Sequence, residues 1–343
     1  MLVALLQLLL SSSLLAQDKT DDILKAYDTR MNGKVEEAKT ILTKVLEKDS
    51  TNALAHFEMA RTIEDQRKSY HIKKALLYDP DNLMYRFYLA NLQMLEAYKA
   101  MRNNDPTIIS ENINNCCESL KSILEIKPNC KESLMFLVDI YGSLPEEIGG
   151  NTELAQTYLD KLKQVDPLYA AQGELILSAK DSDVDIVNYW KEYINRNGEN
   201  VATLKKLGKA NLMSNNIDEA KNCFNKVINQ DPSQNMLHLD VARAHLYSAM
   251  RGGDGADSSL NEFKKNIDIY LNSDGNKPVI VQAWCYGWLG LIEERQGNTE
   301  LANGFKAKAE RIMPSYPRYT ALPKIDLPPN VLAYEFSSYF SPF

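Results

Sequence analysis

The chain has 343 residues, of which 44% are hydrophobic and 25% are charged. These proportions are those of a folded globular protein and exclude a disordered chain. The formal net charge of -7 at pH 7 disfavours a nucleic-acid partner, because a nucleic-acid binder needs a basic face against the phosphates.

The chain begins with an apolar, uncharged segment, MLVALLQLLLSSSLLA, over residues 1–16. This segment is shorter than the roughly 20 residues that span a bilayer, and a small residue, Ala16, precedes the polar residues that follow. The pattern predicts a secretory signal peptide cleaved after Ala16; a buried first helix is the alternative. We therefore expect a mature chain that starts at Gln17, has no transmembrane segment and is periplasmic or secreted.

Amphipathic helical segments then alternate with short boundaries that carry proline, such as Asp79-Pro80, Asp166-Pro167 and Asp231-Pro232. Proline cannot continue a helix, and a period of 20–50 residues indicates a solenoid of repeats. The predicted units are residues 19–52, 53–82, 83–130, 131–167, 168–200, 201–234, 235–273 and 283–316, all within a repeat array over residues 17–316.

The clearest unit, residues 201–234, matches a 34-residue helix–turn–helix template. The matching residues are Leu204, Leu207, Gly208, Ala220, Phe224 and Pro232. On these residues the chain resembles the tetratricopeptide repeat family, in particular exported bacterial members, over most of residues 19–316. The resemblance implies an all-α, right-handed α-solenoid of about eight helix pairs.

Glycine marks two kinds of position in these units. Gly208 and Gly290 are predicted where the first helix of a pair crosses the second, since a side chain there would hold the backbones apart. Two units, 131–167 and 235–273, carry lengthened turns with paired glycines, Gly149-Gly150 and Gly252-Gly253. We interpret these as turns that use the positive φ of glycine; a ligand loop is the alternative.

The family resemblance also implies a binding groove lined by the first helix of each repeat. Carried onto this chain, the groove positions give Phe57, Arg61, Phe87, Asn91, Lys205, Lys209, Arg243 and Trp284. Some family members hold a carboxylate with paired Lys and Asn side chains. That pairing is not reproduced here, because Lys209 follows Lys205 one turn later. The lysines and Arg243 still favour an acidic segment of a partner; a solvated helix face is the alternative.

The residues offer no pattern for catalysis or for a cofactor. None of the four histidines falls in a metal-binding spacing, and no nucleophile–histidine signature is present. The five cysteines lack a CxxC pair, so we expect mostly reduced, buried thiols; a single disulfide at Cys130 is the alternative. We expect neither enzyme activity, nor a metal, nor a cofactor.

The last segment, residues 317–343, is rich in proline and then in aromatic residues. We expect an extended tail whose aromatic residues dock on the chain's own repeats, because a terminal helix pair needs a cap. The rival interpretation is a recognition segment for another protein.

The sequence therefore predicts an exported protein-interaction module or assembly scaffold that binds a peptide or protein in its groove. One alternative is an accessory or ligand-binding component of an envelope transport complex, and another is a hydrolase subunit. An open groove favours a protein ligand, whereas a closed pocket with convergent polar groups favours a small molecule.

Overall fold

The computed structural model describes residues 21–63, 65–103, 105–178, 184–252, 255–275 and 277–313. Within these ranges the secondary structure is helical and no strand occurs. The predicted all-α solenoid of helix pairs is confirmed. The predicted signal peptide (1–16) and tail (317–343) lie outside the described residues, as do Gly253 and Asp254.

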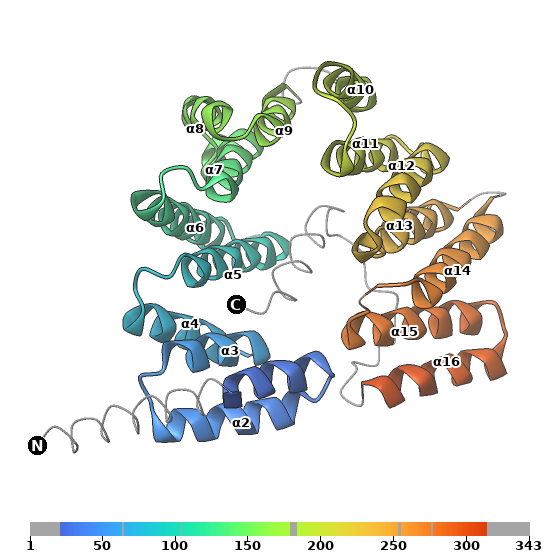
Figure 1. Ribbon diagram of the computed structural model, residues 1–343, viewed down its shortest axis with the longest axis horizontal. Helices are drawn as coiled ribbons and strands as arrows, with labels where there is room; N and C mark the ends of the chain where they lie inside the picture. Colours follow the sequence, from blue (N-terminus) through green and yellow to red (C-terminus); the bar gives the residue numbers. More distant parts are fainter. Residues whose placement is uncertain are drawn as a thin grey trace, which may run out of the picture. The chain divides into compact units, whose positions relative to one another are not determined.

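The described residues divide into two compact units. The first, here called unit 1, contains residues 21–27 and the helices from α2 to α9 (Figure 1). Its labelled α-helices are α2 (Val35–Lys48), α3 (Ala53–Thr62), α4 (Arg67–Tyr78), α5 (Leu83–Arg102), α6 (Pro106–Ile126), α7 (Lys131–Ser143), α8 (Thr152–Val165) and α9 (Pro167–Ser178). Residues 21–31 are also helical, and a short 3-10 turn, η1 (Glu146–Ile148), joins α7 to α8.

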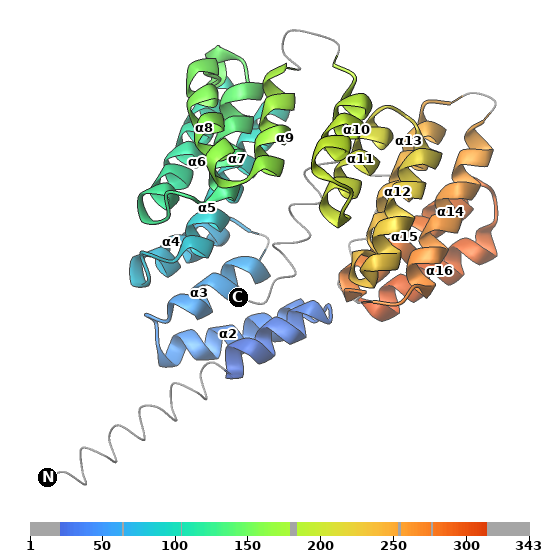
Figure 2. The ribbon, with the colours of Figure 1, turned by 45° about the horizontal axis from the view of Figure 1, so that its top comes forward.

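The second, unit 2, contains residues 28–34 and the helices from α10 onward. Its α-helices are α10 (Ile186–Asn197), α11 (Val201–Met213), α12 (Ile217–Gln230), α13 (Leu237–Met250), α14 (Ala256–Asn272), α15 (Val279–Arg295) and α16 (Thr299–Ile312), with a 3-10 turn, η2 (Pro232–Gln234), before α13. In both units the helices pack mainly as sequential pairs, among them α5 with α6, α11 with α12 and α13 with α14 (Figure 2).

The predicted unit 168–200 contains α9 and α10, which have their main contacts within different compact units. Helix α9 packs on α7 and α8, whereas α10 packs on α11. The two helices therefore belong to different compact units.

Polar caps and prolines set where the helices begin. Asn52, Asn82 and Asn151 each accept a hydrogen bond from a backbone N–H in the first turn of the next helix, which satisfies a donor that has no partner inside the helix. Asn200 and Thr203 form a reciprocal capping box at the start of α11. Pro106 and Pro167 are the first residues of α6 and α9, where a missing N–H costs nothing.

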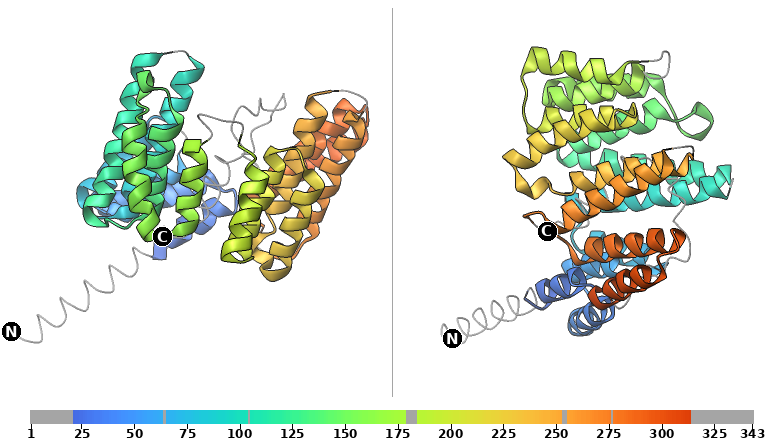
Figure 3. Two further views of the ribbon diagram at one scale, coloured as in Figure 1. Left: turned by 90° about the horizontal axis from the view of Figure 1, so that it is seen from above. Right: turned by 90° about the vertical axis from the view of Figure 1, so that its right-hand side faces the viewer.

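Close helix crossings lie where the glycines predict them. A Cβ added to Gly208 would lie 2.3 Å from Cε1 of Phe224, and one added to Gly290 would lie 2.9 Å from Cγ of Lys306. Ala220 is completely buried and Ala302 is 1% exposed. The small side chains therefore let α11 approach α12, and α15 approach α16, as the sequence predicts (Figure 3).

The lengthened turns also use glycine for backbone reasons. Gly149 and Gly252 have φ values of 112° and 77°, a region that side-chain-bearing residues rarely adopt. A Cβ at Gly150 would lie 1.9 Å from the carbonyl oxygen of Leu144. The interpretation of these glycines as turn residues is confirmed for the described positions.

The apolar core of each unit runs from one helix pair to the next. In unit 1 it passes from the cluster of Ile23, Leu42 and Met59 to that of Phe57 and Tyr85, and on into α6 and α7. In unit 2 it passes from Phe224 and Leu237 to a cluster around Trp288. No pair buries its apolar face alone, as expected for stacked repeats. In the described part of the chain, no helix combines the length and apolarity that crossing a membrane requires.

Candidate functional site

The predicted groove residues lie in four places, two in each unit. In unit 1, Phe57 and Arg61 are on α3, and Phe87 and Asn91 are on α5. In unit 2, Lys205 and Lys209 are on α11, Arg243 is on α13, and Trp284 is on α15.

Phe57 and Arg61 are one helical turn apart and are 2% and 1% exposed. The Phe57 ring contacts the rings of Tyr85 and Tyr88, with centroids 4.6 and 5.4 Å away. The guanidinium of Arg61 lies over the rings of Tyr27 and Phe57, and its Nη1 is 3.4 Å from a carboxylate oxygen of Glu58. This pair is thus part of the packed interior of unit 1.

Phe87 and Asn91 are both half-buried on α5. The ring centroid of Phe87 lies 6.2 Å from that of Phe136 on α7. Phe87 therefore packs between α5 and α7, the first helices of two successive pairs. The Nδ2 of Asn91 donates to the Phe87 carbonyl at 2.8 Å, which leaves Oδ1 as the part of the amide for other contacts.

Trp284 is half-buried on α15, and its ring centroid lies 5.6 Å from that of Trp288. Trp288 is 1% exposed and belongs to the apolar cluster of α13, α14 and α15. Trp284 is therefore packed against this core.

Lys205, Lys209 and Arg243 are brought together with a residue that the sequence did not single out, Asp240. Asp240 is three residues before Arg243 on α13, and the Nη1 of Arg243 is 3.9 Å from its Oδ1. The pKa of Asp240 is lowered by the charges of Lys209, Arg243 and Lys205, in that order, so all three cations lie close enough to act on this carboxyl. We call these four residues the basic cluster.

The basic cluster is partly buried: Arg243 is 7% exposed, and Lys205, Lys209 and Asp240 are half-buried. Burial raises the pKa of the Asp240 carboxyl, and the three cations oppose the rise. Burial also lowers the pKa of the Lys205 ammonium, with Lys209 adding to the effect. Three cations are thus accompanied by two carboxylates, Asp240 and Asp231, in a partly buried site, and an added anion would relieve this imbalance.

Hydrogen bonds hold part of the cluster in place and leave one donor available. The Nζ of Lys205 donates to Oε1 of Gln234 at 2.7 Å, and Nε2 of Gln234 donates to Asp231 at 2.9 Å. The side chain of Arg243 is only 8% exposed, and among the described residues its Nη2 has no hydrogen-bond partner. A buried guanidinium nitrogen without an acceptor is costly, so an anion at this atom would be stabilising.

Sequence reasoning missed Asp240 and Gln234. Asp240 lies three residues before a predicted groove residue, and this i, i+3 spacing places two side chains close together on one helix; that signal was available. The contact from Lys205 to Gln234 spans 29 residues and depends on the turn before α13, which the repeat pattern does not fix.

The side chains that often bind metals are dispersed. In the described ranges, no group of three or more His, Cys, Asp or Glu side chains is arranged to hold a metal ion. All five cysteines, which lie in described segments, are free thiols. Cys130 accepts a hydrogen bond from Ser133 Oγ at 3.5 Å.

Comparisons with known proteins agree with this architecture. A family model described as a tetratricopeptide repeat matches residues 204–233, which begin in α11 and end just after α12. A search of curated protein sequences gave no match.

Three solved structures match the chain over most of its length. They are a tetratricopeptide repeat protein from Parabacteroides merdae (16% identity, 95% of this chain and 100% of that chain, TM-score 0.35), pilF of Pseudomonas aeruginosa (15% identity, 89% and 96%, TM-score 0.25) and yeast Tom70 (10% identity, 94% and 96%, TM-score 0.26). At these identities and TM-scores, none of them bears on what this chain binds.

The matched segment is one of several helix pairs that share its plan. The pair of α15 and α16, outside the match, repeats its close crossing through Gly290 and Ala302. Stacked repeats of this kind form surfaces that bind other proteins. Residues 204–233 thus match a tetratricopeptide repeat, and they lie within an array of helix pairs that share its plan.

Proposed function

We propose that this protein is an exported interaction module that binds an acidic segment of a partner protein at the basic cluster of unit 2. The observation that carries the proposal is the imbalance of charge around Arg243, a cation that is only 8% exposed and whose Nη2 lacks a hydrogen-bond partner within the described part of the chain. Lys205 and Lys209 add two cations, while Asp240 and Asp231 supply two carboxylates, which leaves the cations in excess. A carboxylate from a partner would supply the missing acceptor.

A peptide or protein ligand is favoured over a small molecule by the way the cluster is built. Its residues come from two successive first helices, α11 and α13, and repeats of this type use such helices as an extended surface. The alternative, an accessory component of an envelope transport complex, would use the same surface for a different partner.

The charge reversals Lys205→Glu and Lys209→Glu, made together, test this proposal. We expect the double variant to lose most of its affinity for a fluorescein-labelled hexaglutamate peptide, measured by anisotropy, and to keep its helix content. In the parent the affinity falls as salt rises, because exposed charges are screened. Lys265→Glu, on α14 and ion-paired to Glu262, is the control. Equal affinities of parent and double variant across the salt series would rule the basic cluster out.

Natural partners are tested by crosslinking in the cell envelope fraction, followed by capture of the protein. An acidic partner captured by the parent and lost in the double variant supports the proposal. Export is tested separately by N-terminal sequencing of protein from the periplasmic or extracellular fraction. Gln17 is the expected first residue, and an intact Met1 on cytoplasmic protein would contradict export.

A further inference from the structure

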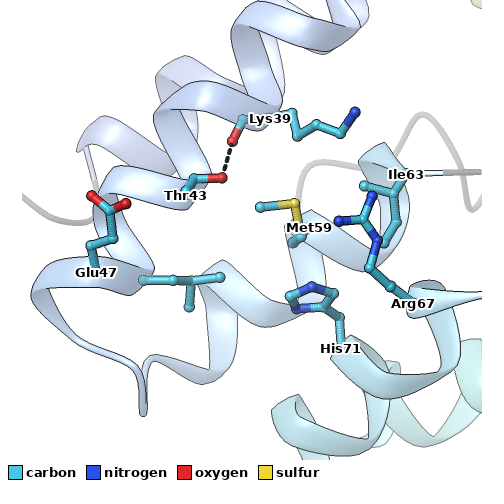
Figure 4. A pocket seen from close by; sticks show the side chains of 8 residues that line it. Lys39, Thr43, Glu47, Met59, Ile63, Arg67 and His71 are labelled. Atoms are coloured by element: carbon cyan, nitrogen blue, oxygen red, sulfur yellow. Dashed lines mark hydrogen bonds between the residues drawn. The ribbon is translucent and has the colours of Figure 1, made fainter. Parts of the chain in front are cut away.

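A cleft of about 310 Å³ lies in unit 1 between α2, α3 and α4 (Figure 4). It is lined by Lys39, Thr43, Leu46, Glu47, Met59, Ile63, Arg67 and His71. Residues two apart on a helix point to nearly opposite faces, so Met59 and Ile63 face away from Phe57 and Arg61. The cleft is therefore a different surface from the predicted groove, and a different site from the basic cluster.

The cleft is apolar in its depth. Met59 and Ile63 are 5% and 3% exposed, and Leu46 is half-buried. Figure 4 shows the Met59 thioether between Lys39 and His71. The volume is at the small end of the roughly 300–1,000 Å³ that ligand pockets occupy, a size that suits one side chain or a small ring. A polarisable thioether makes favourable contacts with aromatic rings.

A chain of hydrogen bonds fixes which proton each histidine carries. The Nε2 of His56 lies 3.1 Å from the Ser50 carbonyl oxygen, which can only accept, so this nitrogen carries the proton. The Nδ1 of His56 is then an acceptor. It lies 2.9 Å from Nδ1 of His71, so His71 donates from Nδ1 and its Nε2 is left with a lone pair.

His71 therefore presents a hydrogen-bond acceptor in a cleft with an apolar floor. Among the described residues no side chain or backbone group donates to its Nε2. Burial lowers the pKa of His71 to about 4 and lowers that of His56 as well, which keeps both rings neutral at pH 7. The acceptor is thus fixed by the contacts of the neighbouring ring.

The rim of the cleft is basic. Lys39 and Arg67 line it together with one carboxylate, Glu47. Both cations hold ion pairs with neighbours in their own segment, Glu36 at 2.8 Å and Asp65 at 2.6 Å. Exposed pairs of this kind are weak, so each cation is able to contact a further carboxylate. Helix α4 itself has four Lys or Arg residues and no Asp or Glu.

We propose that this cleft binds a tryptophan or tyrosine side chain from an acidic segment of a partner protein. The aromatic ring lies on Leu46, Met59 and Ile63, and its N–H or O–H donates to Nε2 of His71. Carboxylates beside the aromatic residue contact Lys39 and Arg67. The ring, the donor and the flanking negative charge each match one feature of the cleft, whereas a purely aliphatic side chain would leave the acceptor of His71 without a donor.

The test uses three N-acetylated, amidated pentapeptides with two glutamates on each side of a central residue. The central residue is tryptophan, 1-methyltryptophan or leucine, and binding to the full chain is measured by isothermal titration calorimetry. We expect the tryptophan peptide to bind about tenfold more tightly than the methylated peptide, because methylation removes the donor. The leucine peptide should bind most weakly.

Two variants connect the affinity to the cleft. His71→Phe keeps a ring but has no acceptor, so the tryptophan and methyltryptophan peptides should bind it equally. Lys39→Glu should weaken both peptides, while Lys44→Glu, an exposed neighbour on α2 that does not line the cleft, should weaken neither. Lys39→Glu leaves the interior untouched and therefore tests the cleft even if His71→Phe unfolds.

Two results would overturn the proposal. One is equal binding of all three peptides to the parent, and the other is no binding of the tryptophan peptide at millimolar concentration. Binding to vesicles containing phosphatidylglycerol that is lost in Lys39→Glu, without peptide binding, would assign this face to a lipid surface instead. The Lys205→Glu, Lys209→Glu variant should retain tryptophan-peptide binding, which separates this test from that of the basic cluster.

Discussion

At the scale of single residues, Gly208 shows how a repeat motif sets a helix contact. Its hydrogen atom is all that separates the α11 backbone from the ring of Phe224, which is 1% exposed. The ring is fixed by the surrounding cluster of Leu204, Val227 and Val241. Glycine is required here for space, since its φ lies outside the left-handed region.

Gly208→Ala should therefore destabilise the protein by about 1–3 kcal/mol, the usual cost of overpacking a core. Gly304→Ala is the matched control: this glycine is also within a helix, α16, but a Cβ there meets no atom within 4 Å. The control should be neutral or slightly stabilising, because alanine favours a helix by roughly 0.5–1 kcal/mol. Thermal or urea unfolding measures the stability of both variants. An equal loss of stability in the two would contradict the close contact between Gly208 and Phe224.

The His56–His71 pair predicts a dependence of stability on pH. The folded pKa of His71, about 4, is below its unfolded value of 6.5, so the neutral pair stabilises the fold above pH 6.5. This stabilisation is lost as the pH falls from 6.5 towards 4, because the unfolded chain binds the proton first.

His71→Gln removes the titrating ring and keeps an N–H donor for His56. Between pH 7 and 5 we expect the melting temperature of the parent to fall more steeply than that of this variant. Carboxylates that titrate in the same range are common to both proteins and cancel in the comparison. Parallel curves of melting temperature against pH would show that the pKa of His71 is not lowered in the folded protein.

At the scale of elements, caps and crossings show what the sequence predicts well. The helix pairs follow from local signals: prolines at boundaries, glycine and alanine at crossings, and Asn or Asp before a first turn. Each signal acts within a few residues, so it can be read without the fold. The capping box of Asn200 and Thr203 is such a signal at the start of α11.

Asn200→Ala should cost about 0.5–2 kcal/mol, since the side chain of Asn200 accepts from two backbone N–H groups, those of Ala202 and Thr203. Asn216→Ala is the control, because Asn216 precedes α12 without a side-chain capping hydrogen bond. The difference between their free energies of unfolding, from chemical denaturation, measures the cap. A larger loss at Asn216 would contradict this assignment.

The packing partners of α9 and α10 could not be predicted from the sequence. The segment 168–200 has the length of a repeat, yet α9 packs on α7 and α8, and α10 packs on α11. The sequence of α9, PLYAAQGELILS, has apolar residues on several faces, so periodicity does not say which face meets which partner.

The candidate sites likewise contain some contacts that the sequence predicts and others that it does not. The repeat register placed Lys205, Lys209 and Arg243 near one another because equivalent positions of successive repeats share a surface. The contact of Lys205 with Gln234 and the hydrogen bond between His56 and His71, in contrast, depend on side-chain rotamers. Such contacts join residues 15 to 29 apart in the chain, and no local pattern encodes them.

At the scale of the whole molecule, the two compact units predict that destabilisation stays local. In Gly208→Ala, amides of α11, α12 and α13 should lose protection against hydrogen exchange, while those of α5 to α8 should keep it. Mass spectrometry of peptic fragments provides the measurement. A uniform loss of protection across both units would show that they unfold together.

The order of these contacts along the chain has a consequence for synthesis. Every residue in the four apolar clusters of unit 1 precedes α10 in sequence, the last being Leu177. Contacts between near neighbours in sequence form quickly, and a domain can fold while later residues are still being added. Once a nascent chain has left the ribosomal tunnel as far as α9, all the residues of these clusters are therefore outside the ribosome. A translational pause after α9 would then give unit 1 time to bury its apolar core.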